Sequence, residues 1–188
     1  NEPVWNADND PGTNYIDLTD TREKARVLHK IKDLQKQTDI IIASIHWGPN
    51  MQERPEPGFI DFAHAMIDHG AHVIHGHSAH IIQGIECYRN SLILYDTGDF
   101  VDDYVVDPEL RNDLSAFYVL TVSKPGLVTL KIVPVRIFEY QVNRARNGDY
   151  EWVMERLKTL SSPFGTHIDE QGKVEVNPAE TRTSIVLK

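Results

Sequence analysis

The chain has 188 residues, the length of one domain or slightly more, and its 40% apolar content can supply a buried core. The formal net charge of −9 at pH 7 repels nucleic acid and anionic membranes, so we expect neither as a partner. No apolar run approaches the roughly 20 residues that span a bilayer, so we expect no membrane segment in this chain. The single cysteine, Cys87, excludes an internal disulfide.

The first half of the chain alternates between helical and strand patterns. Asp20 is a candidate cap for the first helix, with Glu23 reaching back as in a capping box, and Gly70 is placed to end the second. The elements predicted here are an irregular lead-in at residues 1–19, helices at 21–37 and 59–67, and strands at 39–45, 72–74 and 91–95. Their order predicts a βαβ crossover that pairs the first two strands in parallel.

The second half is richer in strand patterns. Residues 116–122 and 127–140 flank a Pro-Gly turn and are predicted to form an antiparallel hairpin. The remaining predicted elements are a helix at 149–160, with Trp152, Val153, Leu157 and Leu160 inward, and a strand at 184–187 in an otherwise loosely structured segment, 161–188. We therefore expect a layered α/β fold with an antiparallel hairpin toward the C-terminus.

Most of the nine histidines lie between His46 and His80, and clustered imidazoles are typical of metal sites. His46 ends one apolar strand, whereas His77 and His80 follow the next one in a Gly-His-Ser-Ala-His turn. Because the carboxyl ends of neighbouring strands meet in one crevice, these three indicate a metal or phosphate site. His75 is either a buried, hydrogen-bonded residue or part of the rim of that site. The histidines on the predicted helices, His29, His64 and His69, are expected on a solvated polar face.

Several segments around these histidines, taken together, resemble the CapA family, named for capsule and poly-γ-glutamate biosynthesis. They are residues 44–48, 63–74, 76–80, 83–86, 95–103 and 160–166. The fold of that family is similar to the calcineurin-like metallophosphatases. The resemblance implies a partial metallophosphatase-like layered α/β sandwich, with the domain at residues 20–140 between the lead-in, 1–19, and a C-terminal helix and extension, 141–188.

The same resemblance implies the chemistry of the site. His46, His77 and His80 correspond to metal ligands and catalytic residues of a metal-dependent phosphoester hydrolase, with His77 alternatively a general acid and His80 a phosphate contact. The implied cofactor is divalent manganese, iron or zinc, which activates water and clamps phosphoryl oxygens. The neighbouring residues implied to bind substrate are Trp47, Gly48, Ser78, Glu86 and Asp99.

The chain departs from the metallophosphatase pattern in three ways. No Asp-x-His, Gly-Asp-x-x-Asp or Gly-Asn-His motif precedes His46, so we expect only the C-terminal half of the domain, completed by a missing N-terminal half or a companion chain. Asp99 and Ser78 stand where the family usually has Asn and His, and His77 and His80 are three apart rather than two. The Gly-Asp-x-x-Asp at residues 98–102 follows the histidines, so we expect a loop that shapes the crevice.

Two functions remain open on this evidence. The first is an enzyme that hydrolyses a phosphoester or performs a related transfer step in capsule synthesis. The second is a non-catalytic subunit of a capsule synthesis or export complex that binds an anionic polymer, which would need local cations such as Arg54, Arg89 and Arg111, or a metal. Relatives in the family are often anchored outside the cytoplasm by an N-terminal segment, which would lie outside this chain.

Overall fold

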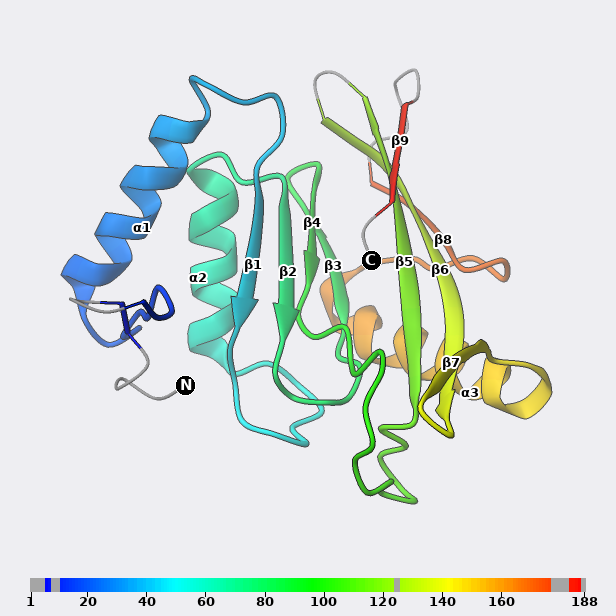
Figure 1. Cartoon of the computed structure of the whole chain (residues 1–188). Helices are drawn as coiled ribbons and strands as arrows, with labels where there is room; N and C mark the ends of the chain where they lie inside the picture. Colours follow the sequence, from blue (N-terminus) through cyan, green and yellow to red (C-terminus); the bar gives the residue numbers. More distant parts are fainter. Residues whose placement is uncertain (1–5, 8–10, 124–125, 177–182, 187–188) are drawn as a thin grey trace.

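The protein is a layered α/β sandwich in a computed structural model that describes residues 6–7, 11–123, 126–176 and 183–186 (Figure 1). The first sheet has the order β1-β2-β4-β3, with strands β1 (Ile42–His46), β2 (Val73–His77), β3 (Ile85–Tyr88) and β4 (Ser91–Leu94). Helices α1 (Thr21–Leu34) and α2 (Pro57–Asp68) pack on one side of this sheet. Among the described residues, no helix is long and apolar enough to cross a membrane.

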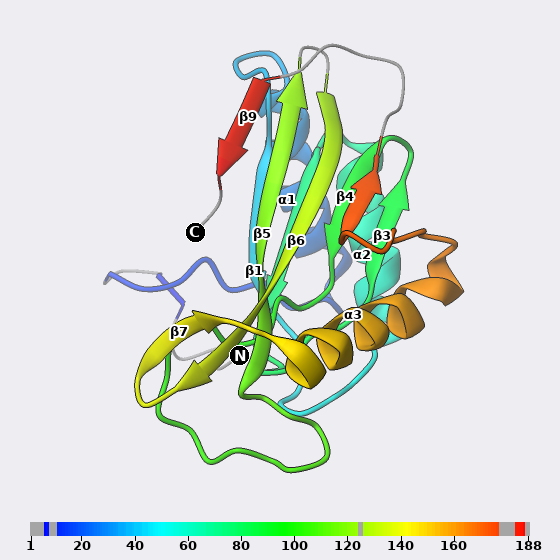
Figure 2. The same ribbon diagram turned by 90° about the vertical axis from the view of Figure 1, so that its right-hand side faces the viewer.

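A second sheet packs against the other face of the first (Figures 1 and 2). It has the order β7-β6-β5-β9, with strands β5 (Leu114–Ser123), β6 (Gly126–Phe138), β7 (Gln141–Arg144) and β9 (Thr183–Val186), and β8 (Lys173–Glu175) also pairs with β6. Helix α3 (Asn147–Ser161) and a 3₁₀ turn, η2 (Ser162–Phe164), close one side of the core. The expected layered α/β sandwich with a C-terminal antiparallel hairpin is confirmed.

The alternation of side chains along the first sheet creates two separate cores. Val73, Leu92 and Leu94 face the second sheet, whereas Ile74 and Ile93 face α1 and α2. This two-residue period is the one that a strand buried on both faces requires. Strand β1 differs because the face that it turns toward the second sheet is exposed at every position, as at Ile42, which is 39% exposed. The sheet is therefore open along β1.

The local predictions hold with small shifts. Asp20 caps α1 by accepting a hydrogen bond from the Arg22 amide at 2.7 Å, while Glu23 reaches back to the Asp17 amide instead of the cap residue. Gly70 follows the end of α2 with a φ of +108°, a conformation that glycine adopts at low cost. The parallel pairing of β1 with β2 is confirmed, and α3 buries Val153, Leu157 and Leu160, with Trp152 partly buried against the same core.

Some predictions were incomplete or wrong. Strands β3, β7 and β8 were not predicted, because three or four residues carry too little alternation to be recognised. Strand β8 lies in the segment expected to be loosely structured, 161–188, and Leu187 of the predicted last strand lies outside the described residues. His64 was predicted to be solvated but is partly buried, bonded to Glu86 and stacked on Tyr88. The three-part domain division stays a prediction.

Gly76 provides a test of how tightly the sheet is packed beside the histidines. A methyl group there would collide with the Tyr95 carbonyl oxygen and with the Trp47 indole nitrogen. We expect Gly76→Ala to lower the free energy of unfolding by about 3 kcal/mol, measured by urea denaturation, because the obstacle is backbone. Gly58→Ala is the control, since nothing lies within 4 Å of its site in α2, and it should be neutral or stabilising by up to about 1 kcal/mol. Equal effects of the two substitutions would contradict this packing.

Candidate functional site

Two imidazoles meet at the carboxyl ends of the parallel strands β1 and β2. The register pairs His46 with His77, so both side chains leave the sheet on the same face. Their ring centroids are 5.3 Å apart and the rings are nearly perpendicular, at 84°. The predicted convergence of His46 and His77 is therefore present in the structure.

The environment of these two rings favours their neutral forms. His46 lies on the exposed face of β1, yet partial desolvation of its ring lowers its pKa, and the neighbouring His77 and His80 lower it further. Burial also lowers the pKa of His77, with a second contribution from His75. The Nδ1 atom of His77 is buried and has no hydrogen bond of normal geometry to the described residues, although the adjacent His75 backbone favours the protonated ring slightly. A neutral imidazole with an unsatisfied nitrogen is a suitable metal ligand or proton acceptor.

His75 lies beside this pair but is held by the fold. Its ring stacks on His77 at a centroid distance of 5.4 Å. Its Nδ1 and Nε2 atoms lie 3.0 Å from the Ser44 hydroxyl and 3.3 Å from the Thr97 hydroxyl. Because both ring nitrogens have partners, the structure favours the buried, hydrogen-bonded alternative for His75, in a position that supports His77.

His80 stands on the loop after β2 and is oriented by a carboxylate. Its Nδ1 lies 2.8 Å from Asp99 Oδ1, and the edge of Tyr104 packs against its ring at 5.0 Å. Because Asp99 occupies Nδ1, Nε2 is the ring nitrogen of His80 that remains for another ligand, as in the carboxylate–histidine pairs that orient metal ligands. Burial raises the pKa of Asp99, while His80 opposes that shift.

The loop that carries His80 is fixed by its backbone. Asp96 accepts hydrogen bonds from the Ala79 amide at 2.7 Å and the Gly98 amide at 2.8 Å, and burial raises its pKa to about 7. Ser78 and His80 have positive φ angles of 136° and 63°, which is uncommon outside glycine. A loop tied down in a strained conformation is a common feature of functional sites. Asp96 was not predicted as a site residue, and its position two residues after the end of β4 was the signal that could have identified it.

The residues predicted to bind substrate fall into two groups. Gly48, Ser78 and Asp99 lie in the loops around the histidines, where the Ser78 hydroxyl donates to the Gly48 carbonyl at 3.1 Å. Trp47 is instead buried on the helix side, and its indole nitrogen donates to the Tyr95 carbonyl at 2.8 Å. Glu86 is also buried there and accepts from the Tyr95 hydroxyl at 2.5 Å. The structure therefore does not place the side chains of Trp47 and Glu86 beside those of His46, His77 and His80.

The described residues do not form a complete metal-binding cluster. In the ranges 6–7, 11–123, 126–176 and 183–186, no group of three or more His, Cys, Asp or Glu side chains is arranged to hold a metal ion. Two convergent imidazoles and an oriented third one are nevertheless in place. The arrangement can bind a ligand from one side, with other groups needed to complete it.

Residues 1–104 match the model of a family described as bacterial capsule synthesis protein PGA_cap, a stretch that includes every histidine and loop described above. The chain belongs to this family. A relative in Mycobacterium tuberculosis, named "Probable polyglutamine synthesis accessory protein", is 38% identical over 154 residues, which are 78% of this chain and 40% of the relative.

The chain is also similar to two proteins named CapA. The capsule biosynthesis protein CapA of Bacillus anthracis is 33% identical over 113 residues, covering 60% of this chain and 27% of the relative. The PGA biosynthesis protein CapA of Bacillus subtilis is 32% identical over 109 residues, covering 58% and 28%. The resemblance to CapA is thus confirmed. The PGA_cap chain spans about two-fifths or less of the length of these relatives.

The lowered pKa values of the site histidines can be measured directly. We expect His46 and His77 to titrate below the ordinary value of 6.5 in a proton–carbon correlation NMR titration between pH 8 and pH 4. An unfolded imidazole takes up its proton near 6.5, so these two histidines make the folded protein less stable as the pH falls below that value.

The two rings have to be titrated individually, because Asp96 changes the stability of the folded protein with pH in the opposite direction, so a measurement of overall stability would not separate the contributions. Its raised pKa costs stability as the pH rises from about 4 to about 7. His46→Gln and His77→Gln identify the resonances. A midpoint at or above 6.5 for either ring would show that it is not desolvated as described.

Proposed function

We propose that this PGA_cap chain is part of a protein of capsule or poly-γ-glutamate biosynthesis whose strand-end histidines form one side of a metal-dependent phosphoester hydrolase site. The names of its relatives, which refer to capsule, PGA and polyglutamine synthesis, support the biological process. The single observation that carries the chemistry is the convergence of His46 and His77, 5.3 Å apart, with the Nδ1 atom of His77 buried and without a normal hydrogen bond among the described residues.

The donor set suits a divalent transition metal. Neutral imidazole nitrogens bind manganese, iron or zinc, and the lowered pKa values of His46 and His77 keep protons from competing for those nitrogens at neutral pH. His46 and His77 would hold the ion, with the Nε2 atom of His80 as a third ligand or a phosphate contact. When bound, a divalent ion lowers the pKa of a coordinated water and polarises a phosphoryl oxygen. The remaining ligands would come from an N-terminal half or a companion chain.

The chain's own residues have separate roles in this proposal. Asp99 holds the ring of His80 through Nδ1, which fixes the nitrogen that faces the substrate. Asp96 fixes the backbone on both sides of that contact through the Ala79 and Gly98 amides. His75 packs against His77 and restricts its ring. These contacts prepare the site before substrate arrives, which reduces the free-energy cost of binding.

A non-catalytic, polymer-binding subunit is the alternative, and one observation favours it: the described residues contain no group of three potential metal ligands. Two of the three arginines considered for binding an anionic polymer are engaged elsewhere, whereas the third, Arg54, is exposed in the loop after β1. Arg111 pairs with Asp113 and Asp149. Arg89 pairs with Asp68. It lies in the turn between β3 and β4, at the end of the sheet opposite to His46 and His77. Metal-assisted hydrolysis is therefore the function that the geometry supports best.

The experiment uses the polypeptide as its gene encodes it, purified with its metal. Metal content is measured by mass spectrometry, and hydrolysis of an aryl phosphate is followed with manganese, iron or zinc added. We expect His46→Ala and His77→Ala each to lower metal affinity and kcat/KM at least about 100-fold, because each removes a ligand.

His29→Ala provides the matched control, because His29 is an exposed histidine on α1 that lies outside the site. It should leave metal content and hydrolysis unchanged. Asp99→Asn should give an intermediate loss, since His80 keeps a hydrogen-bond partner without the charge. If no metal co-purifies and hydrolysis is absent or indifferent to both histidine substitutions, the enzyme reading fails and the polymer-binding alternative stands.

A further inference from the structure

A second surface lies next to the histidine site and is unusually apolar. It consists of the loop at residues 100–106 and the turn at residues 138–140 between β6 and β7, and we call it the loop–turn patch. Of the eight large hydrophobic side chains that are exposed among the described residues, seven are in it: Phe100, Val101, Tyr104, Val105, Val106, Phe138 and Tyr140. Val105 is 90% exposed and Tyr140 is 74% exposed. Concentration of exposed apolar side chains in one place is typical of an interaction surface.

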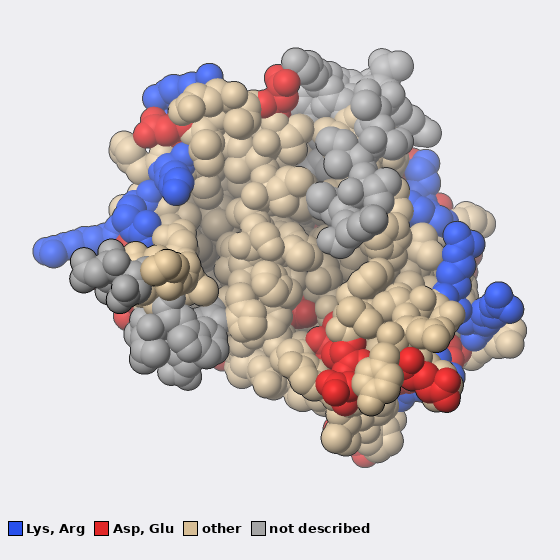
Figure 3. Space-filling model, viewed as in Figure 1, with Lys and Arg blue, Asp and Glu red and all other residues tan. Residues whose placement is uncertain are grey.

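The loop–turn patch also carries unneutralised negative charge. Asp103 and Glu139 line it without an ion pair to another described residue, whereas Asp102, which also lines it, accepts from the Tyr104 amide at 3.0 Å and shares a side-chain hydrogen bond with Asp99. The nearby arginines are already used, since Arg111 and Arg136 both pair with Asp113 and Asp149. Figure 3 shows acidic side chains gathered over the lower end of the second sheet, interrupted by uncharged ones. The patch is therefore apolar and anionic together.

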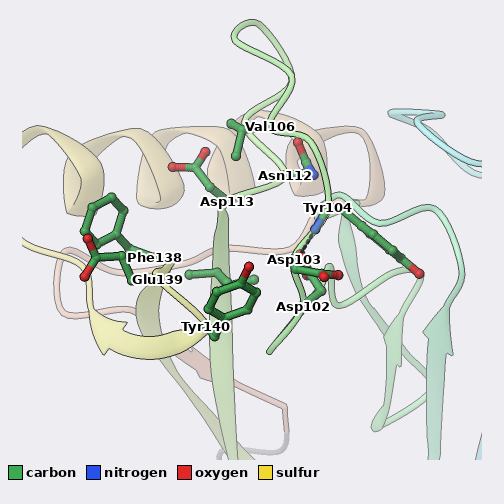
Figure 4. A pocket seen from close by; sticks show the side chains of 10 residues that line it. Asp102, Asp103, Tyr104, Val106, Asn112, Asp113, Phe138, Glu139 and Tyr140 are labelled. Carbon is green, nitrogen blue, oxygen red and sulfur yellow. Dashed lines mark hydrogen bonds between the residues drawn. The ribbon is translucent and has the colours of Figure 1, made fainter.

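The patch is hollow rather than flat. A pocket of about 260 Å³ opens between the loop and the turn, lined by Asp102, Asp103 and Tyr140 among others. Figure 4 shows Tyr140 standing between the two carboxylates on one side and Phe138 and Glu139 on the other, with Tyr104 pointing away from it. The exposed ring and the acidic groups together suit a cationic side chain, which carboxylates attract and an aromatic face can also bind.

The turn at residues 138–140 has a strained backbone conformation that its packing does not explain. Glu139 and Tyr140 have φ angles of 50° and 59°, and Phe138 pairs with Gln141 across them, which makes a two-residue hairpin loop. Such loops favour Asn-Gly because both positions need positive φ. A glutamate and an exposed tyrosine are strained there. Strain of this kind persists where side chains have a role outside folding.

We propose that the loop–turn patch docks a basic, apolar peptide segment of a partner protein, one that carries lysine or arginine beside leucine-like or aromatic side chains. Charge complementarity selects this occupant. A second copy would place Asp102, Asp103 and Glu139 opposite their own counterparts in a two-fold contact, and an anionic membrane would meet the same repulsion. The Tyr104 ring joins the patch to His80, so the docked segment lies next to the histidine site.

Three synthetic peptides test the charge and the apolar requirement in the full chain. The first alternates Lys with Leu, the second alternates Glu with Leu, and the third alternates Lys with Ser, all with blocked ends. Binding is followed by amide NMR shifts and quantified by titration. We expect the Lys-Leu peptide to bind at least about tenfold more tightly than either of the others, with the largest shifts at residues 100–106 and 138–140.

Variants distinguish a docking role from a structural one. Asp103→Asn and Glu139→Gln should each weaken the Lys-Leu peptide severalfold, whereas Glu151→Gln, an exposed glutamate on α3, should not. The double variant Glu139→Asn with Tyr140→Gly should raise the melting temperature, because it relieves the turn, and yet abolish binding. If the patch had only a structural role, the double variant would not gain thermal stability while losing affinity for the peptide.

Other outcomes overturn the proposal. Equal binding of the Lys-Ser peptide would indicate attraction by charge alone, and shifts centred on His46 or His80 would place the contact in the histidine site. If the sedimentation coefficient rises with protein concentration, and this rise is absent in Tyr140→Ser, the patch binds a second copy of the chain instead. Retained binding in the double variant would exclude the turn from the interaction.

Discussion

The parallel register between β1 and β2 is the constraint on which the rest of the site depends. It places Ile42 opposite Val73, Ser44 opposite His75 and His46 opposite His77. A slip of one residue would turn His46 toward the helices and bring Ile45 to the open face. The buried core fixes the register, because Ile74 and Ile93 must face α1 and α2 while Val73 and Leu92 face the second sheet. The histidines therefore acquire their position from the apolar residues between them.

The helix side of the sheet supports this register through a buried polar network. Trp47 follows His46 directly and binds the Tyr95 carbonyl across Gly76, where no larger residue fits. The Tyr95 hydroxyl in turn donates to Glu86, whose other oxygen contacts His64 on α2. Buried polar groups are costly unless each has a partner, and these are satisfied by one another. Thus Trp47 and Glu86, predicted to bind substrate, are held in this buried network on the helix side of the sheet.

The sequence predicts those features of the structure that depend on residues close together in the chain, and it misses those that depend on tertiary contacts. Apolar runs predicted β1, β2 and β4, and the order of the elements predicted the parallel pairing of β1 with β2, so the meeting of His46 and His77 could be predicted. Strand β3 could not, because Glu86 interrupts a four-residue strand and is buried only through contacts made by Tyr95 and His64. The turn at Glu139 and Tyr140 has no glycine or asparagine to mark it. Its place beside the loop at residues 100–106 arises only from tertiary packing.

The two surfaces of the protein are connected by a short physical path. Asp99, directly before the loop at residues 100–106, holds His80, and Tyr104 within that loop packs against the same ring. A segment seated on the loop–turn patch would restrict Tyr104, and the restriction would pass to His80 through direct contact without any long-range network. Because an ordered loop presents the histidine with less loss of conformational entropy, such docking would favour ligand binding at His80. In both proposals, the docked segment at the loop–turn patch and the completed histidine site, the missing groups would come from another polypeptide segment.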